Sequence, residues 1–175
     1  MSSRQMGFKA GLTVALTALG VGIGVLAPGS ALGAAACSGA DKPTADLSKG
    51  KARDAVACLF NAERSARNVR TNRHLEKVAQ SHTETMRQTN CFLHQCPGEL
   101  SLDRRVKRTG YSSSPYVGEV LIQYPSQATP QDVVKAWMNS SPHRAVITNG
   151  RFRDVGVGLS VRGANVIYTA VLGHK

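Results

Sequence analysis

The strongest constraint on the fold lies near the C-terminus, where two strand patterns follow each other. Valine and leucine alternate with glycine and serine over residues 155–161, and residues 165–172 are apolar on both faces of an extended chain. Gly163 lies between them and favours a hairpin. A strand that is apolar on both faces needs a helical layer on each side of its sheet. We therefore predict an α+β fold, a three-layer α-β-α sandwich with a small antiparallel sheet between helices.

Two apolar stripes at helical spacing are candidates for the outer layers. Their residues are Val56, Leu59, Phe60 and Glu63 in the first stripe, and Leu75, Val78, Ala79, His82 and Met86 in the second. Asn72 is a suitable cap for the second helix. We interpret His82 as a hydrogen-bonded core residue, with a ligand role as the alternative.

The segment KAWMNSSPHR, residues 135–144, joins two further predicted helices. The first helix begins at Thr129-Pro130, where threonine is a favoured cap and proline suits the first helical position. The second begins at Ser141-Pro142 for the same reason. This start places His143 in the first helical turn, where the backbone holds its imidazole rigidly.

Residues 1–36 are predicted to be a secretory signal peptide. A basic N-terminal part precedes an apolar run over residues 10–27, and a stretch of small residues follows. An uncleaved membrane anchor and lipidation at Cys37 are the alternatives. We expect residues 37–48 to form an N-terminal arm and residues 49–175 to form one domain. The processed protein is then secreted and has no stable membrane span.

Four cysteines, Cys37, Cys58, Cys91 and Cys96, follow the predicted signal peptide. An even number in an exported chain favours two disulfides, for which three connectivities exist. Proximity in sequence favours Cys91–Cys96 and hence Cys37–Cys58, which would tie the arm to the first helix. A metal site formed by Cys91, His94 and Cys96 is the alternative, although this spacing fits no common zinc module.

The chain is strongly basic. Without residues 1–36 it has 20 Lys and Arg against 11 Asp and Glu, a net charge of +9. Such a charge is typical of attraction to anionic wall polymers, lipid headgroups or nucleic acid, and the alternative, which we favour, is an effect of composition on solubility alone. The basic residues are scattered except for the cluster at residues 104–108. Few aromatic residues lie among them, which argues against nucleic-acid binding.

Three polar residues stand out from their surroundings: His94 in the loop between two cysteines, Glu119 in an apolar strand, and His143. Two imidazoles and a carboxylate suit Zn²⁺ with an open coordination position, and they also suit general acid/base chemistry without a metal. The alternative role for Glu119 is a structural hydrogen-bond anchor to nearby backbone. If Zn²⁺ binds, its affinity should weaken as the pH falls below about 6.5, because both histidines must be neutral.

The order and spacing of several motifs resemble the CAP superfamily, the cysteine-rich secretory, antigen 5 and pathogenesis-related proteins, and most of all its short bacterial SCP-like members. The matching segments are residues 59–64 (LFNAER), 75–82 (LEKVAQSH), 92–94 (FLH), 118–119 (GE), 137–144 (WMNSSPHR) and 152–158 (FRDVGVG). The resemblance implies an α-β-α sandwich with a central cleft that two histidines and two glutamates line in many members.

By this resemblance the cleft histidines are His94 and His143, and Glu119 is one of the glutamates. Ser140 stands at the position of the second glutamate, so one negative charge and one candidate base are absent. We therefore expect His94, Glu119, Ser140 and His143 to line a ligand-binding cleft. His94 and His143, together with Glu119, are the candidate ligands of a Zn²⁺ ion of modest affinity. No catalytic residue is assigned, and Glu119 is the candidate base.

Binding functions agree best with these residues. The resemblance implies a secreted binding module for a lipid or sterol, and the basic charge favours a wall polymer or a protein partner. The alternative is a metal-dependent extracellular hydrolase, in which a metal-activated water or Glu119 acts as the base. No nucleophile motif supports it, because Ser140 and Ser141 lack the Gly-x-Ser-x-Gly context and the cysteines are expected to be oxidised.

Overall fold

A computed structural model describes residues 37–175, so the predicted signal peptide lies outside the described residues. The elements are η1 (Thr44–Asp46), α2 (Lys49–Glu63), β1 (Arg70–Thr71), α3 (Arg73–Thr89), α4 (Leu102–Arg108), β2 (Tyr116–Pro125), α5 (Pro130–Met138), α6 (Ser141–Ile147), β3 (Asp154–Arg162) and β4 (Asn165–His174). None of the helices in residues 37–175 is both long enough and apolar enough to cross a membrane.

The sheet has the strand order β1-β3-β4-β2. Strands β2, β4 and β3 pair in antiparallel fashion, as the sequence predicted, and Gly163 has a positive φ in the β3–β4 hairpin. The short β1 pairs with β3 in parallel, so the sheet is mixed. The sequence gives no strand signal for β1, because its two exposed residues carry no apolar alternation.

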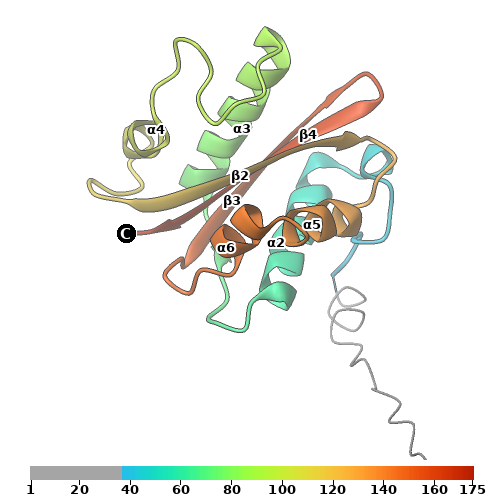
Figure 1. Cartoon of the computed structure of the whole chain (residues 1–175), viewed down its shortest axis with the longest axis horizontal. Coiled ribbons are helices and arrows are strands. Elements are labelled where there is room, and N and C mark those ends of the chain that lie inside the picture. Colours follow the sequence, from blue (N-terminus) through green and yellow to red (C-terminus); the bar gives the residue numbers. More distant parts are fainter. Residues whose placement is uncertain (1–36) are drawn as a thin grey trace, which may run out of the picture.

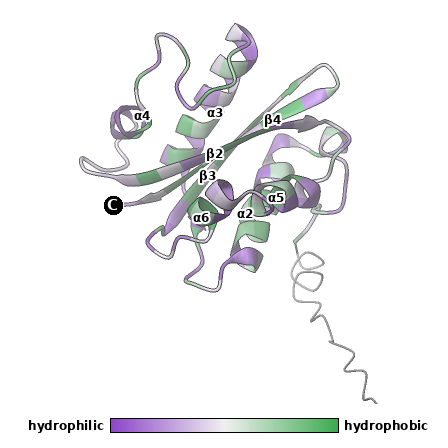
Figure 2. Cartoon of the chain, in the orientation of Figure 1, coloured by the Kyte–Doolittle hydropathy of each residue, from purple (hydrophilic) through white to green (hydrophobic). Residues whose placement is uncertain are grey.

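Helices cover both faces of the sheet, and the predicted three-layer sandwich is confirmed (Figure 1). Helices α3 and α4 pack on one face, and α2, α5 and α6 pack on the other. The larger core forms between the sheet and the α2–α5 layer, around Phe60, Trp137 and Tyr168. Colouring by hydropathy shows that apolar residues dominate β3 and β4, while polar residues gather on the helices' outer faces (Figure 2).

Local capping interactions explain where the helices begin. The Asn72 side chain accepts a hydrogen bond from the backbone N–H of His74 at the start of α3. Thr129 and Asp132 form a reciprocal capping box at the start of α5. The prediction for α6 was wrong by one residue: Ser140 is its N-cap and Ser141 is already helical. Pro142 still fits, because backbone N–H groups in the first helical turn have no partner within the helix.

The two disulfides are Cys37–Cys58 and Cys91–Cys96, the pairing that sequence proximity favoured. The first joins the N-terminal arm to α2. The arm packs on the domain, because the Thr44 hydroxyl donates to the Ala128 carbonyl and lies 2.9 Å from the Tyr168 hydroxyl. Residues 37–48 are therefore partly buried against the α5 side of the sandwich.

Helix α3 lies unusually close to β3. A Cβ atom placed on Gly156 would lie 2.0 Å from the backbone nitrogen of Glu76, and one on Gly158 would lie 2.4 Å from the carbonyl carbon of Ala79. Real Cβ atoms do not approach backbone this closely, so both positions require glycine. This contact fixes the distance between α3 and the sheet.

The side chain of Gln80 adds a specific polar contact to this close packing. Its Oε1 accepts a hydrogen bond from the backbone N–H of Leu159 in β3, and its Nε2 donates to the Leu159 carbonyl. Oε1 also accepts from Arg53 of α2. Gln80 thus pairs with β3 as a neighbouring strand would, and it fixes α3 lengthwise on the sheet.

We expect Gly158→Ala to lower the free energy of unfolding by more than about 3 kcal/mol, because neither α3 nor β3 can move away without breaking the Gln80 contacts. Gly50→Ala in α2 is the control, since open space surrounds Gly50, and its effect should stay within about 1 kcal/mol. Urea denaturation of both variants measures the difference. Equal midpoints for the two variants would contradict the close-packing argument.

Candidate functional site

The candidate site is built around Glu119 on β2, the edge strand of the sheet. Val120 points into the α2–α5 core, whereas Leu121 packs with Met86 on the α3 side. Because side chains alternate along a strand, Glu119 points to the α3–α4 side as well. Its side chain is only 2% exposed. A carboxylate buried to this degree needs hydrogen-bonding or charged partners.

Two cationic or protonatable side chains meet the Glu119 carboxylate. His94 Nδ1 lies 3.0 Å from its Oε1, and Arg105 Nη1 donates to its Oε2 over 3.4 Å. Arg105 Nη2 also donates to the His94 carbonyl, at 2.7 Å. The loop after α3, helix α4 and strand β2 therefore converge on one carboxylate.

His82 on α3 holds the loop that carries His94. It is fully buried on α3, with Nδ1 3.0 Å from a Glu99 carboxylate oxygen and Nε2 3.0 Å from the Leu93 carbonyl. The other carboxylate oxygen of Glu99 accepts from the backbone N–H of Cys96. These contacts agree with a hydrogen-bonded core role for His82. Its position holds both ends of the segment that carries His94.

His143 lies on α6, on the other side of the β2 edge. Partial burial lowers its pKa below the ordinary value, and the nearby charge of His94 lowers this pKa further. The two predicted histidines are thus close enough to interact electrostatically. Within residues 37–175, however, no hydrogen bond or ion pair joins His143 to His94 or Glu119. Ser140 caps α6 through its backbone, accepting from the N–H of Arg144.

The structure therefore joins two of the four predicted cleft residues directly, His94 and Glu119, and places His143 nearby. Arg105 and Glu99 belong to the site and were missed. Arg105 falls in the basic cluster at residues 104–108, which suggested a solvated surface. A signal was present, since Arg105 follows Leu102 by three residues and precedes the buried Val106, so it shares their side of the helix.

The contact with Glu119 raises the pKa of His94 above its ordinary value, chiefly through the hydrogen bond to the carboxylate. Partial burial and the positive charge of Arg105 oppose this rise. The imidazole itself remains 63% exposed. It is therefore held at one nitrogen and open to a ligand at the other.

The predicted three-ligand zinc site is not assembled in this arrangement, because both oxygens of Glu119 are already bonded, while Nε2 of His94 stays open. His94 Nδ1 is hydrogen-bonded directly to Glu119, and the guanidinium of Arg105 occupies the other carboxylate oxygen. Among residues 37–175, no group of three or more His, Cys, Asp or Glu side chains is positioned to hold a metal ion. We therefore derive no chemistry from a metal here.

The fold and the paired His94 and Glu119 define a class of protein, the SCP-like α-β-α sandwich domains. The model of the family described as "CAP: Cysteine-rich secretory protein family" matches residues 52–172. The chain belongs to this family.

Relatives and solved structures agree with this assignment. The chain is 37% identical over 112 residues to "Uncharacterized protein YkwD" of Bacillus subtilis (strain 168), a match that covers 62% of this chain and 42% of that protein. The chain thus spans less than half the length of this relative. Its fold is similar to an extracellular protein containing a SCP domain from Bacillus anthracis str. Ames, with a TM-score of 0.64, 23% identity, and coverage of 74% of this chain and 44% of the other.

A further fold match is an outer surface protein from Borrelia burgdorferi, with a TM-score of 0.65 and 18% identity. It covers 74% of this chain and 96% of that one. Almost the whole of that matched chain thus has the same fold.

We expect Glu119→Gln to lower the pKa of His94 towards 6.5, because an amide cannot stabilise the imidazolium as a carboxylate does. Two-dimensional NMR titration of the histidine ring protons measures this shift, with the exposed His174 as the internal reference. An unchanged His94 titration in this variant would contradict the pairing.

The same pair predicts how stability depends on pH. A histidine whose folded-state pKa is raised stabilises the protein fully below its unfolded pKa of about 6.5, and this contribution is lost as the pH rises through the folded pKa. Wild type should therefore lose more stability above pH 6.5 than His94→Gln does. Urea midpoints across this pH range measure the effect, with His174→Gln as the control.

For zinc, we expect wild type and the His94→Ala/His143→Ala variant to bind equally weakly, because His94 and Arg105 already occupy Glu119. Isothermal titration calorimetry with zinc chloride at pH 7.5 tests this. Binding that is at least about tenfold weaker in the double variant, a difference of about 1.4 kcal/mol, would instead establish the predicted metal site.

Proposed function

We propose that this protein is an exported binding domain whose cleft beside β2 holds the polar end of an amphiphilic ligand of the lipid or sterol type. One observation carries the proposal: two exposed apolar side chains directly precede the exposed imidazole of the His94–Glu119 pair. Phe92 is 44% exposed and Leu93 is 58% exposed. Apolar side chains this exposed beside a fixed polar group are typical of a ligand or interaction surface.

The polar half of the site suits a ligand hydroxyl or carboxylate. With Nδ1 bonded to Glu119, the neutral imidazole of His94 presents Nε2 as an acceptor, and the protonated form presents it as a donor. Because Glu119 holds the ring and Arg105 holds the backbone carbonyl of His94, less rotamer entropy remains to be lost on binding. The raised pKa of His94 favours the donor form at mildly acidic pH.

The loop that presents these groups is cross-linked. Cys91 and Cys96 close it at both ends, and the Leu93 carbonyl is held by His82. Phe92 and Leu93 are therefore exposed on a segment whose backbone is fixed. This preorganisation supports a binding role, because a mobile loop would lose more entropy when it binds a ligand.

The geometry gives less support to the alternative, a hydrolase. The Glu119 carboxylate is already hydrogen-bonded by His94 and Arg105, so it is not free to take a proton from water. A hydrolytic base also needs a reactive water or nucleophile within hydrogen-bond reach. Exported location, suggested by the predicted signal peptide and the two disulfides, is common to both functions.

The binding proposal predicts that Phe92→Ser/Leu93→Ser weakens uptake of a fluorescent fatty acid or sterol by at least about tenfold, because two apolar contacts worth about 1.5 kcal/mol or more each are removed. Val161→Ser is the matched control, since Val161 is 46% exposed and lies on β3, outside the loop of residues 91–96. Fluorescence titration and native mass spectrometry of the secreted protein provide the measurements. Equal uptake by both variants and wild type would refute the proposal.

The hydrolase is tested with the same protein preparations. Peptide, ester and cell-wall substrates are incubated with wild type and His143→Ala, and product release is followed. Two results together would favour the hydrolase over the binding domain. Wild type would take up no amphiphile, and its hydrolysis of a substrate would be lost in His143→Ala.

A further inference from the structure

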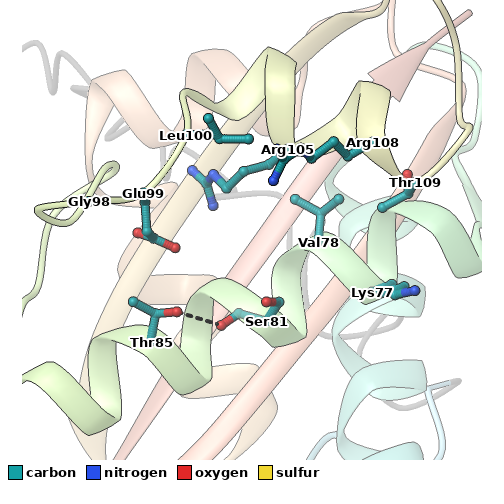
Figure 3. A pocket seen from close by; sticks show the side chains of 10 residues that line it. All are labelled: Lys77, Val78, Ser81, Thr85, Gly98, Glu99, Leu100, Arg105, Arg108 and Thr109. Atoms are coloured by element: carbon teal, nitrogen blue, oxygen red, sulfur yellow. Dashed lines mark hydrogen bonds between the residues drawn. The ribbon is translucent and has the colours of Figure 1, made fainter.

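A second concave surface lies between α3 and α4, away from the apolar residues of the loop. Its volume is about 360 Å³, within the range of small-molecule sites. Figure 3 shows side chains from both helices and from the connecting loop around this pocket. Val78 and Leu100 contribute apolar surface, and Ser81 contributes a hydroxyl group.

Positive charge dominates the lining of this pocket. Lys77, Arg105 and Arg108 line it, against a single carboxylate, that of Glu99. Lys77 and Arg108 make no ion pair within residues 37–175. Glu99 bonds to His82 and to the Cys96 backbone, and among residues 37–175 it forms no ion pair with either cation. Figure 3 places Glu99 at one end of the pocket and Lys77 at the other.

Arg105 adds a fixed positive charge to the wall of the pocket. Its side chain is only 11% exposed, and its two terminal nitrogens bond to Glu119 and to the His94 carbonyl. Its Nε is buried and closed to a ligand in this arrangement. The guanidinium therefore contributes through its charge, while the exposed Lys77 and Arg108 offer the free donors.

We propose that this pocket binds the phosphate group of a small phosphoester. Lys77 and Arg108 supply the donors and the charge that attract the dianion, Arg105 adds a fixed positive charge, and Ser81 lines the same pocket. Arginine and lysine are the residues that most often bind phosphate oxygens. The carbon part of the ligand lies against Val78 and Leu100.

The pocket is distinct from the cleft beside β2. The two sites share Arg105 and Glu99, whose hydrogen bonds serve the cleft through Glu119, the His94 carbonyl and His82. Lys77 and Arg108 make no contact with His94 or Glu119 among the interactions of residues 37–175. The phosphate site therefore does not depend on the amphiphile-binding proposal, and each can fail without the other.

The test uses calorimetric titration of the oxidised full-length exported protein with inorganic phosphate and with glycerol 3-phosphate at low salt. We expect saturable binding of both probes, with glycerol 3-phosphate at least as tight. Lys77→Gln/Arg108→Gln should bind each probe at least about tenfold more weakly, since two charge-assisted contacts are lost. Both residues are exposed, so the variant should fold, which circular dichroism and urea denaturation verify.

The matched control is Arg104→Gln/Lys135→Gln, which removes the same net charge from exposed residues outside the pocket. It should bind both probes within about twofold of wild type, because distant surface charges are screened. Equal weakening in both double variants would overturn the proposal and leave only general charge attraction. Absence of saturable binding would also overturn it. The protein could also bind phosphatidylglycerol vesicles but neither soluble probe. That result would overturn the proposal and show that the basic residues bind an anionic lipid surface instead.

Discussion

The contact of α3 with β3 is the constraint on which the rest of the molecule depends. Two glycines, Gly156 and Gly158, allow the helix backbone to approach the strand to a distance that no side chain would permit. Gln80 then bonds to the Leu159 backbone and fixes the helix along its axis. The distance between α3 and the sheet and the position of α3 along β3 are thereby both determined. Every residue on the buried face of α3 then has a defined position above the sheet.

The candidate cleft follows from that register. His82 lies on α3 two residues after Gln80, and its ring bonds to the Leu93 carbonyl and to Glu99. The loop between them is closed by Cys91–Cys96 and carries His94 to Glu119. Since Glu119 lies on the edge strand, α6 can also reach this point from the opposite face. A contact between helix and sheet thus determines where a pair of polar side chains meets at the sheet's edge.

Much of this fold could be predicted from the sequence, because it is encoded locally. Apolar periodicity, the Asn72 and Thr129 caps and the doubly apolar last strand each indicate a single element. The meeting of His94 with Glu119 was expected through the family resemblance and not through spacing, since 25 residues separate them. Arg105 was missed because a basic cluster looks the same whether one of its members is buried or all are solvated, and only its spacing from Leu102 indicated the buried side of α4. The short β1 was missed since two polar residues pair with β3 through backbone alone.

Gln80 has a consequence beyond the register of α3. An exposed strand edge is a template for pairing with strands of other molecules, which leads to aggregation. Strand β3 has only the two-residue β1 on its outer side, at Asp154 and Val155, so Leu159 lies beyond the end of that partner. The Gln80 amide occupies the Leu159 N–H and carbonyl and thereby blocks the addition of another chain there. The residue that positions the helix therefore also covers part of an open strand edge.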